Sequence, residues 1–176
     1  MASADALWAF SLAVYSRDGV ADECLDLQER LGLDVNILLF AAFIGAVEGM
    51  RLESQDIAAA NAAVAAWQSE IVRSLRRARR ALKPASAEAD NSLHAANSAL
   101  RAQVKAAELE AERIEQAMLW QWLRTEFAGP PHMDRNRALA ANLRGVLAFY
   151  GVAAAEAEAT LPRLRQTAAA YRQSRQ

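Results

Sequence analysis

The first 48 residues constrain the fold of this chain most strongly, because they hold its densest run of aromatic and aliphatic side chains. Three stretches carry them: L-W-A-F-S-L-A-V-Y at 7–15, C-L-D-L-Q at 24–28 and G-L-D-V-N-I-L-L-F at 32–40. Elsewhere alanine is common and makes up about a quarter of the chain. Since a buried methyl group contributes far less than a buried Leu or Phe side chain, we expect the N-terminal stretch to form the folding core.

The secondary structure is predicted to be helical throughout. Alanine is the strongest helix former, and no stretch shows the alternation of apolar and polar residues that is typical of a half-buried strand. The seven glycines and four prolines lie almost entirely between segments with helical periodicity. The predicted fold class is therefore all-α.

The N-terminal segment predicts three short helices separated by glycine. Ser3 is placed to cap a first helix that ends near residue 17, a second helix spans residues 20–31, and Asp34 caps a third that runs to residue 47. The third helix is apolar on almost every side, which is typical of a helix buried between others. We expect these helices to form a compact three-helix head over residues 1–52.

Two long amphipathic segments follow the head, at residues 54–83 and at about 90–127, each with its apolar residues on one face. Pro84 stops the first helix and residues 84–89 form a turn, so the two helices are predicted to make a long antiparallel hairpin within residues 53–128. The far end of the second helix is apolar all round, and we expect the head to cover it.

Residues 129–176 predict two further helices. The sequence Gly129-Pro130-Pro131 is a break, Asp134 caps one helix, and a last helix runs from about 155 to 173 with Pro162 in its first turn. These C-terminal helices are expected to pack back on the rest of the chain, so that all three parts form one structural domain.

The composition excludes several classes of protein. A single cysteine excludes an internal disulfide, and two histidines far apart in the sequence argue against a histidine-based metal site. No apolar run reaches the roughly 20 residues of a membrane-spanning helix, and the N-terminus lacks the basic segment of a signal peptide. We predict a cytoplasmic protein that has no transmembrane segment and needs no cofactor.

The head motif resembles a proteobacterial family of small helical proteins of unknown function. The pattern LWxFSLxxY…CLxLQ…GxDVNxLL carries the resemblance, and weaker matches continue through residues 67–113, covering about two thirds of the chain. The resemblance implies a bacterial origin. It brings no reaction, substrate or cofactor with it.

Four polar side chains lie among the apolar residues of the head: Ser11, Tyr15, Gln28 and Asn36. Apolar walls with a few placed polar groups are typical of small-molecule sites, so these residues are candidates for a binding or enzymatic pocket. The structural alternative is that they satisfy backbone groups at helix ends, which packing would otherwise leave without hydrogen bonds. The sequence leaves both interpretations open.

No residue pattern in the chain predicts catalysis. Cys24 falls on the apolar stripe of the second helix and has no basic neighbour in its helical turn that would activate it. Neither His94 nor His132 has a glutamate three residues before it, as a di-metal helical bundle requires. We therefore predict no catalytic residues and no metal site.

The sharpest local feature is the run R-S-L-R-R-A-R-R-A-L-K at 73–83. At 100° per residue its basic side chains fall opposite the packing stripe and are predicted to face solvent; they are Arg73, Arg76, Arg77, Arg80 and Lys83. A turn near 85–87 would place this run beside residues 88–99, where only Glu88 and Asp90 are acidic. It would place the glutamates of 108–115 beside residues 56–64, too far away to neutralise the arginines.

The charge of the chain is distributed unevenly. Residues 1–56 hold 3 basic and 10 acidic side chains, a net charge of −7, whereas residues 57–104 hold 7 basic and 3 acidic ones, a net charge of +4. Opposite charges on the head and the arm favour association, and the alanine-rich hairpin stripe offers a second surface for it. We predict a non-enzymatic interaction or adaptor protein that has a protein partner or forms a weak homodimer. Nucleic-acid or ribosome binding through the arginines, and a small-molecule or enzymatic pocket in the head, are the alternatives.

Overall fold

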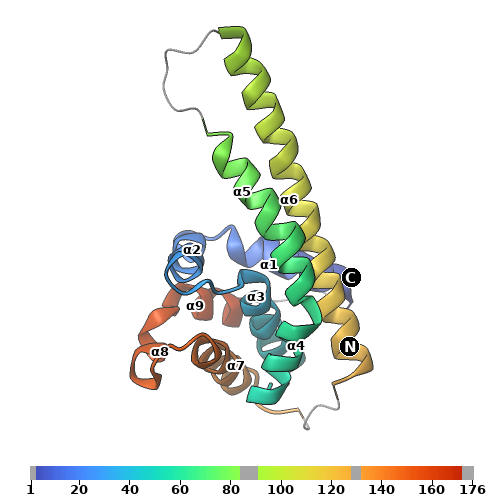
Figure 1. Ribbon diagram of the computed structural model, residues 1–176. Helices are drawn as coiled ribbons and strands as arrows, with labels where there is room; N and C mark the ends of the chain where they lie inside the picture. Colours follow the sequence, from blue (N-terminus) through green and yellow to red (C-terminus); the bar gives the residue numbers. More distant parts are fainter. Residues whose placement is uncertain (1–2, 84–90, 128–131, 172–176) are drawn as a thin grey trace. The chain divides into compact units, whose positions relative to one another are not determined.

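The computed structural model describes residues 3–83, 91–127 and 132–171, and every secondary-structure element in these ranges is a helix (Figure 1). The prediction of an all-α fold is therefore confirmed. The predicted turn at 84–89, the break at 129–131 and the end of the predicted last helix at 172–173 lie outside the described residues.

The chain forms two compact units. The core unit comprises Met1–Ala63 and Gln116–Gln176, and the hairpin unit comprises Val64–Glu115. Two helices, α4 (Ser54–Trp67) and α6 (Asn91–Thr125), contribute to both units because each runs across a boundary.

The core unit begins with the three predicted helices, α1 (Ala4–Tyr15), α2 (Val20–Leu31) and α3 (Val35–Phe43). Two predicted caps are confirmed, because Ser3 Oγ accepts the N–H of Ala6 at 3.1 Å and the Asp34 carboxylate accepts the N–H of Asn36 at 2.9 Å. Gly32 ends α2 with a φ of 65°, a left-handed conformation that favours glycine.

Helix α3 continues into a π-helical turn, η1 (Ile44–Glu48), where the sequence predicted regular helix up to residue 47. Gly45 in this turn lies against α7 (Arg135–Phe149), and a Cβ on it would meet the backbone N and Cα of Leu139 at 2.5 Å. π-Turns are rare within helices and mark places of special packing or function. Here the turn lies where two helix backbones come into direct contact.

The C-terminal residues form two helices, α8 (Ala154–Thr160) and α9 (Pro162–Ala170), so the prediction of one helix from 155 to 173 is wrong. Proline has no backbone N–H and cannot continue a helix, but it fits the first helical position, which Pro162 occupies. Glu23 of α2 caps the new helix, because its carboxylate accepts the N–H groups of Arg163 and Leu164 at 2.9 and 3.0 Å.

Aromatic side chains join α3 to the last turns of α6 in the centre of the core unit. The Phe40 and Trp122 rings lie 6.2 Å apart and the Phe43 and Trp120 rings 6.1 Å apart, both edge to face. Such pairs combine a large buried area with a favourable ring orientation. The expectation that the N-terminal helices cover the apolar end of α6 is therefore confirmed.

The hairpin unit contains two antiparallel stretches of helix (Figure 1). The end of α4 continues through a second π-turn, η2 (Gln68–Val72), into α5 (Arg73–Ala81), and α6 returns beside them. Two hydrogen bonds fix the register: Trp67 Nε1 donates to the carbonyl of Ala111 at 3.0 Å, and Asn97 Nδ2 donates to that of Leu82 at 3.3 Å.

The predicted hairpin register is wrong by about two helical turns. Residues 108–112 of α6 lie beside Trp67 and α5, and not beside residues 56–64 as predicted. Helical periodicity determines which face of each helix packs, but it leaves open how far one helix is displaced along the other. That displacement determines which glutamates of α6 lie next to the arginines of α5.

Candidate interaction surface of the helical hairpin

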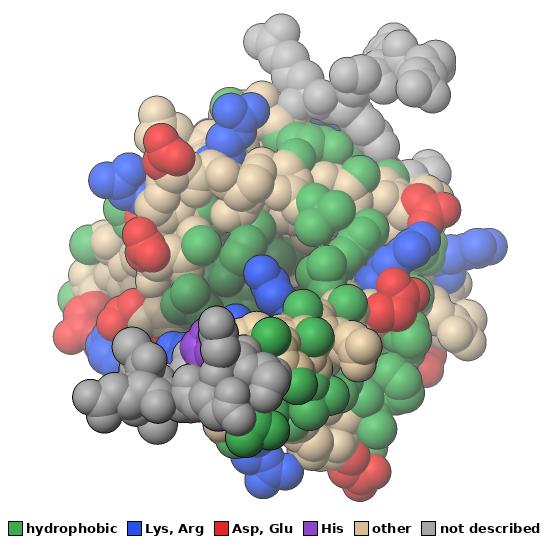
Figure 2. Space-filling view, turned by 90° about the horizontal axis from the view of Figure 1, so that it is seen from above, with side chains coloured by type: hydrophobic (Ala, Val, Ile, Leu, Met, Phe, Trp, Pro, Cys, Tyr) green, Lys and Arg blue, Asp and Glu red, His purple; other side chains and the backbone are tan. Residues whose placement is uncertain are grey.

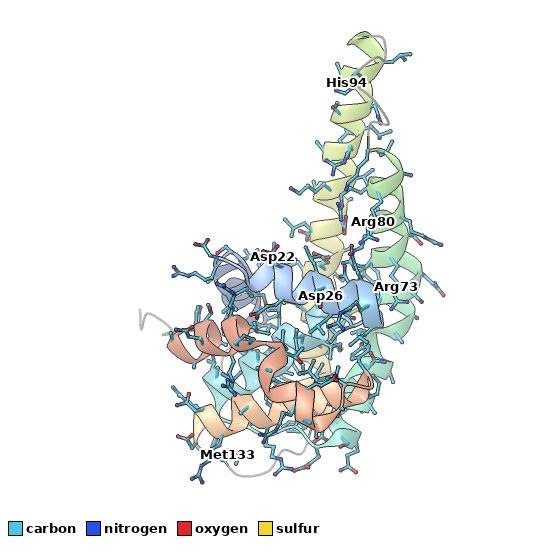
Figure 3. The ribbon with its side chains drawn as sticks, turned by 90° about the vertical axis from the view of Figure 1, so that its left-hand side faces the viewer. Asp22, Asp26, Arg73, Arg80, His94 and Met133 are labelled. Carbon is cyan, nitrogen blue, oxygen red and sulfur yellow. The ribbon has the colours of Figure 1, made fainter. Side chains whose placement is uncertain are left out.

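Four of the five predicted basic site residues are exposed: Arg73, Arg77, Arg80 and Lys83. The three arginines are spaced four and three residues apart, which places them on one face of α5, and Figure 3 shows Arg73 and Arg80 on this helix. Arg77 also donates a hydrogen bond to Ser74 Oγ at 3.1 Å. We call these four residues the basic row.

Arg76, the fifth predicted residue, points into the hairpin and not to solvent as predicted. Its Nε donates to Glu108 Oε1 at 3.0 Å and its Nη2 to Glu112 Oε1 at 2.7 Å, and its side chain is only 17% exposed. The expectation that the glutamates of residues 108–115 cannot neutralise the arginines is therefore wrong. The cause is the register, which brings two of these glutamates to α5.

Arg79 is a residue that the sequence analysis missed. Its Nε donates to Glu108 Oε2 and its Nη2 donates to Glu108 Oε1 at 3.2 Å, so that one carboxylate receives two guanidinium groups. Arg76 and Arg79 are three residues apart and so share a helix face. The sequence shows that spacing. It does not show that Glu108 of α6 lies at the same level of the hairpin as these two arginines.

The electrostatics of this cluster favour the charged forms of its members. Burial alone would raise the pKa of Glu108, but hydrogen bonds from Arg79 and Arg76 outweigh it and hold that pKa below its ordinary value. Burial likewise opposes the charge of Arg76, whereas Glu108 and Glu112 raise its pKa. The segment 73–83 thus contains both an ionic cluster, formed by Arg76 and Arg79 with glutamates of α6, and the exposed basic row.

Two of the four predicted pocket residues in the head come together in the core unit. Ser11 Oγ donates to Gln116 Oε1 at 3.0 Å, and Gln116 Nε2 donates to Asn36 Oδ1 at 3.0 Å. All three side chains are buried. The third member, Gln116, was not predicted from the sequence; the available signal was an amide next to the apolar end of α6.

The other two candidates, Tyr15 and Gln28, are half-buried residues in the last turns of α1 and α2. A further buried amide, that of Asn142 in α7, holds the chain after η1. Its Oδ1 accepts the N–H of Leu52 at 2.8 Å, and its Nδ2 donates to the carbonyls of Ala41 and Met50 at 3.1 and 3.0 Å. Buried backbone groups need such partners, so Asn142 has a structural role.

Cys24 is fully buried on α2, and burial, followed by the charge of Glu23, raises the pKa of its thiol to about 12. Only the thiolate is an effective nucleophile, so this side chain stays protonated and inert near neutral pH. In the described part of the chain, no group of three or more His, Cys, Asp or Glu side chains lies where it could hold a metal ion.

The exposed surface is chemically mixed. In the view of Figure 2, acidic and basic side chains are scattered over the surface and hydrophobic ones are exposed between them. Within the ranges that the structure describes, no helix is long and apolar enough to cross a bilayer.

These features define an all-helical protein whose buried polar clusters hold helices together and whose hairpin exposes a basic helix face. A family model matches residues 6–119, and the chain belongs to that family, described as "Protein of unknown function (DUF2390)". No curated protein and no solved structure matches the chain.

Proposed function

We propose that this is a non-enzymatic interaction protein, which binds an acidic surface of a protein partner through the basic row on α5 and just after it. The observation that carries the proposal is the exposure of four cations within one short segment. Arg73, Arg77, Arg80 and Lys83 are exposed, and the ion pairs of Arg76 and Arg79 with Glu108 hold this helix to α6.

The chemistry of arginine suits this role. A guanidinium group binds a carboxylate with two parallel hydrogen bonds, and its charge is permanent. The three arginines of the basic row lie on consecutive turns of α5, a spacing that matches an acidic helix or an extended acidic segment. The ion pairs of Arg76 and Arg79 with Glu108 hold α5 against α6, which limits the loss of conformational freedom on binding.

The buried groups of the core unit support a structural and not a chemical role. Ser11 and Asn36 are hydrogen-bonded to Gln116, and the Cys24 thiol is protonated. We therefore do not propose a small-molecule or enzymatic pocket in the head. The buried thiol also suits a reducing compartment, and we include a bacterial cytoplasmic location in the proposal.

The test is affinity capture of the full-length chain in extracts of its native cell, with and without nuclease. The variant carries Arg73→Gln, Arg77→Gln and Arg80→Gln. The matched control carries Arg124→Gln, Arg135→Gln and Arg137→Gln, which removes the same charge from exposed positions of the core unit.

We expect the control to retain the partner and the basic-row variant to lose it. At about 0.5 kcal/mol for each exposed charge, three charges amount to about a tenfold loss of affinity. Binding that is weaker in high salt supports an ionic contact. A partner retained by the basic-row variant overturns the proposal, and a partner released by nuclease favours nucleic-acid binding instead.

A further inference from the structure

We infer that the hairpin carries a second, apolar binding surface on α6, and that its occupant is a second copy of this chain, packed antiparallel on the same surface. This inference goes beyond the proposed function because it concerns other residues, another occupant and another force. Two observations carry it: a seven-residue repeat of apolar residues in α6, and the exposure of one row of that repeat in the hairpin unit.

Apolar residues recur in α6 at the two spacings of a coiled coil. Leu93, Leu100, Ala107 and Ile114 are each seven residues apart, and we call them the leucine row. A second row, also with seven-residue spacing, lies four residues further along the chain and consists of Asn97, Val104 and Ala111. Rows offset by four and three residues form the contact seam of a coiled-coil helix.

Only the second row is covered within the hairpin. Ala111 is buried and its carbonyl accepts the Trp67 indole N–H, while Asn97 and Val104 are half-buried and Asn97 reaches the Leu82 carbonyl. In the leucine row, by contrast, Leu93 is 68% exposed, Leu100 48% and Ile114 40%, and Ala107 is exposed as well. Half of the seam is therefore open to solvent.

The leucine row lies away from the ionic cluster on α6. At 100° per residue, Glu108 and Glu112 fall about 60° and 100° to one side of Ala111, and the leucine row falls at 0° to 60° on the other side. The hairpin thus has an ionic flank, where Arg76 and Arg79 bind Glu108, and an apolar flank. Exposed aliphatic side chains that line up along one flank are typical of a protein contact surface.

The leucine row is complementary to itself. Two copies of α6 that cross antiparallel at the middle of the row, near Gln103, bring the Leu93 end of one copy to the Ile114 end of the other. The same crossing brings Leu100 of each copy near Ala107 of the other, so that large side chains meet small ones. A two-fold axis of this kind gives a closed dimer.

The flanking residues allow this pairing. Beside the leucine row lie Ala96, Gln103 and Glu110, one in each interval of the repeat. In the antiparallel crossing Gln103 meets its own copy and Glu110 meets Ala96, so no two like charges face each other. The small side chain of Ala96 also lets the two helices approach closely.

The size of the surface predicts a weak dimer. The row from Leu93 to Ile114 is about 32 Å long at about 1.5 Å per residue, and a helix face is about 10 Å wide. Each copy thus contributes about 300 Å², well below the roughly 800 Å² per partner of a standard stable interface. Association is therefore expected only at high protein concentration.

The test is sedimentation equilibrium of the full chain over a range of concentrations, at low and at high salt. The variant carries Leu100→Gln and Ile114→Gln. The matched control carries Leu25→Gln and Leu109→Gln, which are comparably exposed leucines outside the row. A circular dichroism spectrum and a thermal melt of each variant ensure that folded proteins are compared.

We expect a monomer–dimer equilibrium in the wild type and the control that high salt does not weaken, and at least a tenfold weaker association in the leucine-row variant. A wild type that stays monomeric at every concentration overturns the inference, as does a row variant that dimerises like the wild type. Neither result affects capture of an acidic partner by the basic row, so the two proposals fail independently.

Discussion

Glu108 of α6 accepts a hydrogen bond from Arg76 of α5, with 3.0 Å between Oε1 and Nε, and both side chains are largely shielded from water. Arg79 binds the same carboxylate. A buried charge that loses its partner is costly, so this cluster makes the register of the hairpin energetically specific. The alanine-rich stripe alone would resist a sliding of the two helices much less.

We expect Glu108→Gln to lower the free energy of unfolding by about 1–3 kcal/mol, the usual range for losing a hydrogen bond to a charged group. The amide keeps the shape of the side chain but leaves the two guanidinium groups with one carboxylate fewer. Urea denaturation measures the change. The control is Glu110→Gln on the exposed side of α6, for which we expect a change within about 0.5 kcal/mol. Equal effects of the two substitutions would contradict the role of the cluster.

The stability that Glu108 contributes should disappear in acid. Its pKa in the folded protein lies below the ordinary value of 4.5, so the unfolded chain takes up the proton first as the pH falls. The contribution is therefore complete well above pH 4.5 and is lost as the pH drops through the lower, folded-state pKa. The difference in unfolding free energy between the wild type and Glu108→Gln should shrink from pH 7 to pH 3. A difference that stays constant would show that this carboxylate is not stabilised in the folded protein.

Local sequence rules were sufficient for most helix boundaries. Ser3, Asp34 and Asp134 cap α1, α3 and α7 as predicted, since a cap needs only a side chain and a backbone N–H two or three residues away. Gly32 ends α2 for an equally local reason. Pro162 was placed in the first turn of a longer helix, although its missing N–H was the local signal for a new helix that begins there.

What the sequence could not determine depends on contacts between distant segments. The π-turn η1 lies where Gly45 meets the backbone of Leu139, nearly one hundred residues away in the sequence. No residue pattern within α3 predicts this π-turn. The partners of Arg76 depend on how far α6 is displaced along α5. The basic segment was visible in the sequence, but the pairing of Arg76 with two glutamates of α6 was not.

We expect Ser11 and Gln116 to be energetically coupled, so that the effect of replacing one depends on whether the other is present. Replacing Gln116 with Leu leaves the buried Ser11 hydroxyl without its acceptor, and we expect a loss of about 1–3 kcal/mol. Once Ser11 is Ala, the same replacement should cost less, because no donor is left unpaired on that side. A double-mutant cycle by urea denaturation measures the coupling. Strictly additive effects would mean that the two groups do not interact in solution.

The contact between Gly45 and Leu139 predicts a substitution effect of unusual sign. Alanine in place of glycine inside a helix normally stabilises by about 0.5–1 kcal/mol. At position 45 the new Cβ would lie 2.5 Å from backbone atoms of α7, which cannot move aside, so we expect Gly45→Ala to destabilise the protein by about 1–3 kcal/mol.

The matched control is Gly145→Ala in α7, where the new Cβ would meet only the Cδ1 atom of Ile57, at 2.6 Å. That atom is the end of a side chain that can rotate away, so the helix-forming gain of alanine offsets much of the crowding and we expect a net change near zero. Chemical denaturation of both variants measures the contrast. If Gly45→Ala were as stable as Gly145→Ala, the two helix backbones could not be in the direct contact that places η1 against α7.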